Sequence, residues 1–576
     1  MSRECGYIVA AVVLAGGTAR AADHHVCDCG ESADADCMAG DDAADGASPA
    51  SAWRTYIKAR TEFGSIPAGD AILFCDGGSF VVEGGSRWVN VGCTVGTPCT
   101  VGDYVPPWAS GDEARPVLVS TGDHGLALED GGDAEHEEGY VIRDLVLVCE
   151  GCDASSGNGF FLYNDIDDVV IENVQIEGFS IGVHLAGSNA CSADPECDGK
   201  NSRLELRSST ITDCLTQGFL GAGDGTIIEG NRFEHNGTTA VFDHNIYMSG
   251  AQDETVGSRI VGNELYRSDL DVTGSCAGVS LVVHGAHRGL VIEGNLVRED
   301  PGLAGQGCWG IAVDGGYDEA ESFTDVVIRG NTVLNVGNTA IGVSSCVGCI
   351  IENNVVVSEQ DFGTLGIACP DRDRGAGDAE MTGVVVRNNS IFMSGPGGTG
   401  VRLGTEGAGH AIVSNAILYS GMGDWNCLDA DLGASSYDVI DHNACHFPAA
   451  DAEWEDGSGT SPDPLLAWSS ASGFDTRSLL DDPGFSSPAG PDFDLSAASD
   501  ASAIVDAGHP TLSSPIDIEG NARDTNPDIG AFEYGAAPPP DSVDEPPDAT
   551  TDVPADPEPE VEDGGGRGGC GCKVAS

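Results

Sequence analysis

Two phrases of the sequence hold side chains that can move protons. FDHNIYMSG runs from Phe242 to Gly250, and LVVHGAHRG runs from Leu281 to Gly289. Histidine and tyrosine can act as general base and general acid when their surroundings tune their pKa values. The residues that we predict to be catalytic are His244, Tyr247, His284 and Arg288.

These side chains suit β-elimination in a polysaccharide that contains uronic acids. A base removes the proton next to the uronate carboxyl group, and an acid protonates the leaving oxygen. A cation must neutralise the carboxylate as the carbanion develops, and Arg288 or a bound Ca²⁺ could supply that charge. Asp243 and Asp314 are the predicted calcium ligands, and they would provide only part of the oxygen shell that calcium needs.

A short phrase that recurs along the chain predicts the strand that carries these residues. It occurs as IGVHLAG, HNIYMSG, AGVSLVV, WGIAVDGG, TAIGVSS and GTGVRLG. Alternation with period two places one set of side chains inside, namely Val183, Ile246, Met248, Val279, Ile311, Val313 and Val401. The outward set is His184, Asn245, Tyr247, Ser280, Asp314 and Arg402. We predict that substrate is bound by Asn245, His287, Asp314, His184 and Arg402.

A second repeated phrase predicts the rest of each coil. VVIENVQI, TIIEGNRF, LVIEGNLV and VVIRGNTV each join two short apolar runs through a turn that contains asparagine. The turn asparagines are Asn231, Asn263, Asn295, Asn331, Asn354, Asn389 and Asn415. Their spacing of about 22 to 36 residues is that of solenoid coils. We expect them to occupy left-handed corners and to hydrogen bond from coil to coil.

These phrases resemble those of the right-handed parallel β-helix, or pectate-lyase-like, superfamily over roughly Ala43 to Tyr534. The resemblance implies an all-β solenoid whose outer sheet face binds a polysaccharide across successive coils. In such proteins an HxIY strand precedes a coil with a Lys/Arg pair. Here His284 stands where the lysine is expected, and Arg288 keeps a basic group nearby.

The resemblance also predicts how the solenoid begins and ends. Residues 46–480 form the β-helix, which a short helix with Ser51 as its N-cap covers through Trp53, Tyr56 and Ile57. Residues 481–535 resemble the closing segment of exported β-helix proteins. Residues 536–576 form a disordered, proline-rich acidic tail that ends in Cys-Gly-Cys, similar to surface-sorting tags.

The N-terminus and the cysteines predict an exported protein. Residues 1–21 read as a signal peptide with a small-x-small cleavage site at Ala19-Arg20-Ala21, and residues 22–45 form an acidic segment with cysteines. Removing Cys5 leaves an even number of cysteines, which favours disulfides over metal sites. The close pairs are Cys93/Cys99, Cys149/Cys152, Cys191/Cys197, Cys346/Cys349 and Cys427/Cys445. We therefore expect a secreted, extracellular or cell-surface protein without a membrane span.

The charge of the chain limits its partners. Ninety-three acidic residues against 25 basic ones give a net charge of −68, which argues against nucleic-acid binding and favours a soluble monomer. A polyanionic sugar would need a locally basic cleft or divalent cations. The acidic–basic loop PDRDRGAGD (Pro370 to Asp378) is interpreted as solvated rather than metal-binding.

Two functions fit these observations. One is a polysaccharide lyase-like enzyme that acts between residues 243 and 314, and the other is a non-catalytic adhesin or glycan-binding protein. Each candidate residue also has a structural interpretation. His244 could bond a turn, Tyr247 could only stack on sugars, the two later histidines could be polar surface, and Asp314 could be a turn residue.

Overall fold

The computed structural model describes residues 21–129, 139–164, 166–187, 200–238, 242–250, 254–317, 320–372, 375–404, 407–423, 425–430, 436–448, 453–455 and 463–536. Residues 1–20 of the predicted signal peptide, the Cys191/Cys197 pair and the Cys-Gly-Cys of the predicted tail lie outside these residues. The chain divides after Ala537 into two units, and all of the described residues belong to the first.

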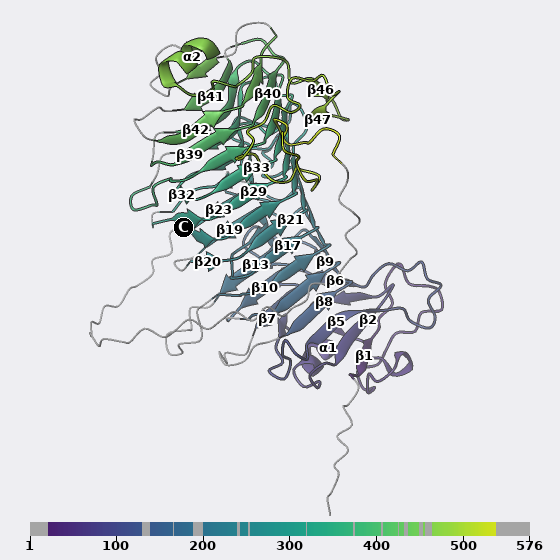
Figure 1. Cartoon of the computed structure of the whole chain (residues 1–576). Coiled ribbons are helices and arrows are strands. Elements are labelled where there is room, and N and C mark those ends of the chain that lie inside the picture. The colour runs from purple at the N-terminus through teal and green to yellow at the C-terminus, as the bar shows by residue number, and fades with distance from the viewer. Residues whose placement is uncertain are drawn as a thin grey trace, which may run out of the picture. The chain divides into compact units, whose positions relative to one another are not determined.

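Three long parallel sheets run through the described chain, and each coil contributes one strand to each sheet in turn (Figure 1). Sheet 1 contains, in spatial order, β1 (Asp23–Val26), β2 (Ala71–Cys75), β5 (Cys99–Tyr104), β8 (Tyr140–Arg143), β11 (Val169–Glu172), β14 (Glu205–Arg207), β17 (Ile227–Glu229), β21 (Arg259–Val261), β25 (Val291–Glu293), β29 (Val327–Arg329), β33 (Ile350–Glu352), β36 (Val385–Arg387), β39 (His410–Val413) and β42 (Tyr437–Asp441). Sheet 2 contains β3 (Ser79–Val81), β6 (Val117–Ser120), β9 (Val146–Cys149), β12 (Gln175–Glu177), β15 (Thr210–Thr212), β18 (Arg232–Glu234), β22 (Glu264–Tyr266), β26 (Leu296–Arg298), β30 (Thr332–Leu334), β34 (Val355–Ser358), β37 (Ser390–Met393), β40 (Ala416–Tyr419) and β43 (Ala444–His446).

Sheet 3 contains β4 (Arg87–Trp88), β7 (Leu126–Glu129), β10 (Phe160–Tyr163), β13 (Ile181–Gly187), β16 (Gln217–Leu220), β19 (Ile246–Ser249), β23 (Val279–His284), β27 (Trp309–Val313), β31 (Thr339–Val343), β35 (Thr364–Cys369), β38 (Gly398–Leu403), β41 (Trp425–Ala430), β44 (Glu453–Glu455) and β45 (Asp463–Pro464). A small fourth sheet joins β20 (Thr255–Val256), β24 (Ala286–Arg288), β28 (Ser322–Thr324) and β32 (Cys346–Val347). This order is a right-handed parallel β-helix, as the sequence predicts.

Apolar side chains fill the inside of every coil in columns that follow the strand register. In sheet 1, Ile228, Ile260 and Ile292 are paired neighbours on successive coils and are fully buried. In sheet 3, the predicted inward residues Val183, Ile246, Met248, Ile311, Val313 and Val401 all lie in this core. Stacking like on like removes each apolar face from water, which no single coil could do alone.

The turn asparagines form a continuous hydrogen-bonded ladder inside the corner between sheets 1 and 2. The backbone N–H of Asn263 donates to Oδ1 of Asn295 at 2.9 Å, and Asn295 repeats this with Asn331 at 3.0 Å. Each Nδ2 also donates to a carbonyl of the preceding coil, as Asn295 does to Ile260 at 2.9 Å. The ladder confirms the expected coil-to-coil bonds.

The ladder corrects the expected corner conformation. The left-handed residue is the one before each ladder asparagine, for example Gly262 (φ +63°) and Gly294 (φ +65°). Later corners use Asn353 and Asn388 at the same place. The ladder asparagines themselves are absent from the positive-φ residues, because their side chains point inward along the stack.

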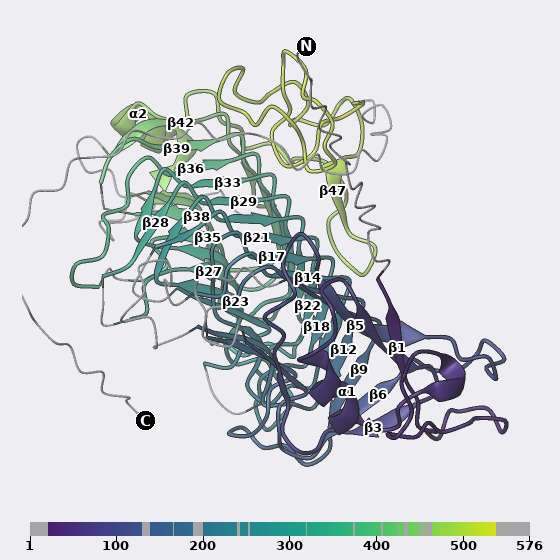
Figure 2. The same ribbon diagram turned by 90° about the horizontal axis from the view of Figure 1, so that it is seen from below.

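The N-terminal end begins earlier than predicted. β1 pairs with β2 as the first strand of sheet 1, so the solenoid starts within residues 22–45. The helix α1 (Tyr56–Phe63) follows a 3₁₀ turn, η1 (Pro49–Ser51), and lies beside the first strands (Figure 2). Its N-cap is Thr55, whose hydroxyl accepts from the Lys58 N–H, rather than Ser51.

The cap of the first coil is made by fewer residues than expected. Trp53 and Tyr56 are buried, but Ile57 is exposed and points away from the core. Tyr56 and Phe63 pack edge-on against Trp88 of β4 instead. The Tyr56 hydroxyl also accepts from the Trp88 indole N–H at 2.8 Å, which holds the cap over the first coil.

The C-terminal end also differs from expectation. Helix α2 (Leu465–Ser472) follows the last strands, and its Trp468 indole donates to Asp475 at 2.9 Å. The segment expected to close the last coil carries the hairpin β46 (Phe485–Ser487) and β47 (Asp494–Ala497). It covers an outward apolar patch of sheet 2, where Leu495, Ile504 and Ile529 pack with Val355, Val357, Phe392 and Leu418.

Disulfides join neighbouring parts of the coils. The close pairs expected at Cys93–Cys99, Cys149–Cys152, Cys346–Cys349 and Cys427–Cys445 are bonded. The structure adds Cys27–Cys75, Cys29–Cys37 and Cys276–Cys308, and leaves Cys214 and Cys369 as buried thiols. Neither α1 nor α2 is long and apolar enough to cross a membrane, and the described residues contain no other helix that could.

The ladder predicts a large loss of stability for Asn295→Ala. The substitution leaves the buried Asn263 N–H without its acceptor and removes the side-chain donor to the Ile260 carbonyl. We expect the free energy of unfolding to fall by about 2–4 kcal/mol in urea denaturation, from the cost of unsatisfied buried groups. Asn526→Ala, at an exposed position, is the matched control. Equal losses in both variants would show that the ladder does not stabilise the fold.

Candidate functional site

The outer face of sheet 3 carries four of the predicted site residues, His184, Tyr247, His284 and Arg402. Strand register places His184, Leu220, Tyr247 and Val282 side by side on successive coils. Arg402 lies further along the same column. The outward orientation predicted for His184, Tyr247 and Arg402 therefore holds.

His284 is the centre of a cluster on this face. It ends β23, and its Nδ1 lies 2.6 Å from the backbone carbonyl of Asp314, one coil later. A carbonyl can only accept, so in neutral His284 the proton is on Nδ1 and Nε2 is free to act as a base. A Cβ at Gly316 would lie 2.5 Å from the imidazole, so only glycine allows the turn to pack against it.

Two tyrosines flank the His284 ring. The Tyr247 ring meets it edge-on at 5.6 Å, and the Tyr317 ring lies tilted at 5.3 Å. The two phenol oxygens are hydrogen bonded to each other at 2.9 Å. Burial raises the pKa of both phenols, so both keep their protons at neutral pH.

A pair of carboxyl groups lies beside this imidazole. Asp314 follows β27 and is fully buried, and Asp371 approaches it closely enough for the two groups to share a proton. Burial raises the pKa of both groups, and in Asp314 the neighbouring Asp371 charge raises it further. The Arg372 guanidinium lies 2.5 Å from the Asp314 carboxylate and balances the remaining negative charge.

The strand between these two aspartates makes their approach possible. Asp371 belongs to the coil of β35, two coils after β27, and must reach across β31. A Cβ at Gly342 of β31 would lie 2.4 Å from the Asp371 carboxylate, so the glycine leaves the necessary space. We call Tyr247, His284, Asp314, Tyr317, Asp371 and Arg372 the His284 cluster.

Sequence reasoning missed half of this cluster. Asp371 and Arg372 belong to the loop that was interpreted as solvated, and Tyr317 follows a Gly-Gly turn. Glu321 fixes that turn, because its carboxylate accepts the N–H groups of Gly316 and Tyr317. The usable signal was the apolar run TLGIAC followed after one proline by an acidic and a basic residue, with a glycine in the outward column of the preceding coil.

Two predicted residues next to each other in the chain are buried beneath the outer face. Asn245 is wrongly predicted to point outward: it is 0% exposed, accepts from Asn236 at 2.9 Å and donates to Ser280 at 3.3 Å. His244 is also buried, with its Nδ1 2.8 Å from the Val279 carbonyl. These contacts match the structural interpretation of His244 as a residue that bonds a turn.

The alternation fails because the chain bends near the start of several sheet 3 strands, where the strand register skips one residue pair, Gly182/Gly218 between β13 and β16 and Ser280/Gly310 between β23 and β27. Small or internally bonded residues occupy the inward position at this bend, as at Gly182, Gly218, Asn245, Ser280 and Gly310. Val279 is displaced by the same bend. It was predicted to point inward but packs with Val282, Ala312, Tyr247 and Trp309 in a cluster separate from the main core.

His287 and Arg288 lie on β24 of the small sheet rather than on sheet 3. His287 is 1% exposed, stacks on Phe323 and has its Nε2 3.0 Å from the His284 carbonyl, so it cannot contact substrate. Burial lowers its pKa to about 4, which keeps it neutral. Arg288 is exposed and paired with Glu254, so it does not supply the cation of the His284 cluster.

The remaining predictions concern metal binding. Asp243 and Asp314 do not belong to one group of potential ligands, and Asp314 faces Arg372. Among the described residues, such a group is formed by Cys276, Glu299 and Cys308, whose cysteines are joined in a disulfide. Calcium binding by Asp243 and Asp314 stays a prediction. Arg402 is paired with Asp429 of the next coil.

No protein-family model matches the sequence, and no curated protein is significantly similar to it. Solved structures that resemble it are parallel β-helix proteins. Pectate lyase Pel9A is 12% identical, covering 89% of this chain and 97% of its own, with a TM-score of 0.36. The A-module of the Azotobacter vinelandii mannuronan C-5 epimerase AlgE6 is 15% identical, covering 68% and 95%, with a TM-score of 0.46.

A third similar structure is the catalytic unit of a GH87 α-1,3-glucanase from Streptomyces thermodiastaticus. It is 14% identical, covering 71% of this chain and 68% of its own, with a TM-score of 0.44. At these identities the likeness concerns the fold alone.

The shared proton predicts a pH dependence of stability. Burial raises the pKa of Asp314 and Asp371 above the ordinary 3.8, so the folded chain holds a proton that the unfolded chain releases. The stability that this proton contributes is fully present below the ordinary carboxyl pKa and is lost as the pH rises above it. Asp371→Asn should therefore flatten the fall in unfolding free energy as the pH rises above the ordinary carboxyl pKa of 3.8, measured by urea denaturation.

Asp429→Asn is the matched control for this variant, because it removes a carboxylate paired with Arg402 elsewhere on sheet 3. Equal slopes in the two variants would contradict a proton shared between Asp314 and Asp371.

Proposed function

We propose that this protein is a secreted, carbohydrate-active β-helix protein that binds a polysaccharide across sheet 3 and cleaves it by β-elimination at the His284 cluster. The observation that carries this proposal is the position of His284. Its Nδ1 is fixed by the Asp314 carbonyl, and its ring lies between two protonated phenols. A base and an acid are thereby held side by side on an outer face.

In the proposed reaction, His284 Nε2 takes the proton from the sugar carbon next to the uronate carboxyl group. The electron pair left behind forms a carbon–carbon double bond as the glycosidic bond to the neighbouring carbon breaks. The leaving oxygen takes a proton from the Tyr247–Tyr317 pair. Both phenols keep their protons at neutral pH, as a proton donor must, because burial raises their pKa values.

The carboxylate of the substrate must be neutralised while the carbanion develops. Arg372 is the cation next to the reacting groups, and its guanidinium lies 5.5 Å from the Trp309 ring centre on the same face. A proton shared by Asp314 and Asp371 removes one of their two negative charges. The cluster can therefore accept an anionic sugar although the whole chain carries a charge of −68.

Glycoside hydrolysis by the two aspartates is less compatible with this geometry. Hydrolases keep their two carboxyl groups about 5–5.5 Å or about 6.5–9.5 Å apart, so that a sugar and a water can lie between them. Asp314 and Asp371 instead lie close enough to interact directly, and burial raises the pKa of both. This contact leaves no room for a glycosidic bond between the two groups.

The second candidate function is glycan binding without catalysis, as in an adhesin. The observation in its favour is the half-buried aromatic surface around Tyr247 and Trp309, which packs over an outward apolar cluster on sheet 3. Such a surface binds sugar rings whether or not a reaction follows. Product formation distinguishes the two functions.

The decisive assay follows ultraviolet absorbance of unsaturated products. The purified protein is incubated with pectate, alginate and glycosaminoglycans, with and without Ca²⁺. We expect product from at least one polymer and a loss of at least ~100-fold in rate for His284→Ala, because a general base contributes about that much. Retained glycan binding without product on any uronate would support the adhesin and refute the lyase proposal.

Arg288→Ala is the informative comparison. Its side chain is exposed on the small sheet and paired with Glu254, so we expect the rate to stay within about 2-fold of wild type, as for surface changes outside a site. Circular dichroism of both variants checks that the fold is kept. A large loss in Arg288→Ala would instead return the cationic role to that residue.

A further inference from the structure

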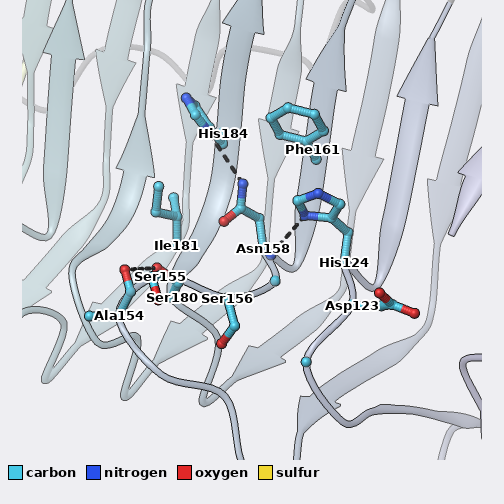
Figure 3. A pocket seen from close by; sticks show the side chains of 12 residues that line it. Asp123, His124, Ala154, Ser155, Ser156, Asn158, Phe161, Ser180, Ile181 and His184 are labelled. Carbon is cyan, nitrogen blue, oxygen red and sulfur yellow. Dashed lines mark hydrogen bonds between the residues drawn. The ribbon is translucent and has the colours of Figure 1, made fainter. Parts of the chain in front are cut away.

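A pocket lies on the outer face of sheet 3, several coils before the His284 cluster. It has a volume of about 460 Å³, within the range of about 300–1,000 Å³ that is usual for ligand pockets. Its walls are the turn at Gly122–His124, the loop Ala154–Asn158, and outward residues of β10 and β13 (Figure 3). We call it the His124 pocket.

The rings in this pocket are held in fixed positions. His124 and Phe161 are stacked with ring centres 4.4 Å apart and planes at 5°, and His184 lies 5.5 Å from Phe161 on the next coil. Asn158, whose side chain lies between the two imidazoles in Figure 3, ties them together. Phe161 supplies an apolar wall between two polar groups.

Hydrogen bonding fixes which nitrogen of each imidazole carries the proton. The backbone N–H of Asn158 donates to His124 Nδ1 at 3.0 Å, and the Asn158 amide lies 3.2 Å from His184 Nδ1. With both Nδ1 atoms accepting, each neutral ring has its proton on Nε2. Burial lowers the pKa of His124, and lowers that of His184 to about 4, so both rings are neutral donors near pH 7.

The remaining polar groups are hydroxyls. Ser155, Ser156 and Ser180 line the pocket, and Ser180 donates to the Ala154 carbonyl at 2.9 Å. A hydroxyl can donate and accept, so this wall suits a ligand that is itself rich in hydroxyl groups. The apolar wall and the convergent donors and acceptors together match a sugar ring.

The charge of the pocket selects among sugars. Asp123 is the one acidic side chain among the lining residues, and no lysine or arginine lines the pocket. With neutral imidazoles, nothing in the lining offsets the desolvation of a uronate carboxylate. The pocket therefore disfavours the anionic sugar that the His284 cluster accepts next to Arg372.

We propose that the His124 pocket binds an uncharged sugar unit of the same polymer that reacts at the His284 cluster. Phe161 on β10 and His284 on β23 are separated by four strand steps through β13, β16 and β19. At about 4.8 Å per step this is roughly 19 Å, a span of several sugar units. The substrate is then an acidic heteropolysaccharide with neutral sugars, bound well inside its chain ends. This inference rests on the proposed function for the class of polymer.

The test titrates the full chain, labelled with ¹⁵N-histidine, with neutral hexasaccharides of β-1,4-linked glucose, xylose and mannose, and with hexagalacturonate. We expect at least one neutral hexasaccharide to shift the His124 and His184 ring signals, and hexagalacturonate to leave them unchanged. Phe161→Ala should lower the affinity for that neutral hexasaccharide at least 10-fold, measured by titration calorimetry. His184→Phe keeps a ring but loses the N–H donor, and it should lower the same affinity at least 5-fold.

Tyr266→Ala is the matched control, because it removes an outward aromatic from β22 of sheet 2 and should bind as wild type does. The proposal is overturned if no neutral hexasaccharide shifts the two histidines, or if hexagalacturonate binds there as tightly. Pocket binding without unsaturated product from any uronate polymer would refute the proposed function alone. Product formation with full affinity in Phe161→Ala and His184→Phe would refute the pocket alone.

Discussion

Hydrogen bonding between successive coils is the constraint on which this structure depends. Most strands are only three to six residues long, and each finds its backbone partners one coil before and one coil after. The asparagine ladder extends the same rule to side chains inside a corner, where water cannot satisfy the turn. Tyr247, His284 and Asp314 come from three consecutive coils, so their spacing follows directly from the stacking of β19, β23 and β27.

The repeats made the fold and much of the core predictable from the sequence. A period of two within short β-branched runs identifies inward columns, and asparagine at solenoid spacing identifies the ladder. The same period failed at strand starts, where Asn245 and Val279 were assigned to the wrong side. Alternation assumes a straight strand, but several sheet 3 strands bend near their start. Glycine at the equivalent place in neighbouring coils, such as Gly218 and Gly310, is the local sign of that bend.

The site was only partly predictable, because its residues come from different coils and the coils differ in length. Distance along the sequence therefore does not show which residues meet. Asp371 meets Asp314 across an intervening strand, and loops between strands vary too much for spacing to reveal this. The contact depends on Gly342, because any side chain at this position would collide with the Asp371 carboxylate. The sequence shows the glycine but does not show that Asp371 lies next to it. Arg288 shows the opposite error: it is close to His284 along the chain, yet the chain turns onto the small sheet between them.

The stacking of coils also fixes distances along the solenoid in equal steps. Every coil adds one strand to each long sheet, and the coils from Asn231 to Asn415 each add one rung to the ladder. A whole coil gained or lost therefore leaves the strand pairing of its neighbours intact. The His124 pocket and the His284 cluster are separated by whole coils. Duplication or deletion of one coil between them would change their distance in steps of about 4.8 Å without altering either site. Gain or loss of whole coils can therefore match such a solenoid to polymers of different repeat length.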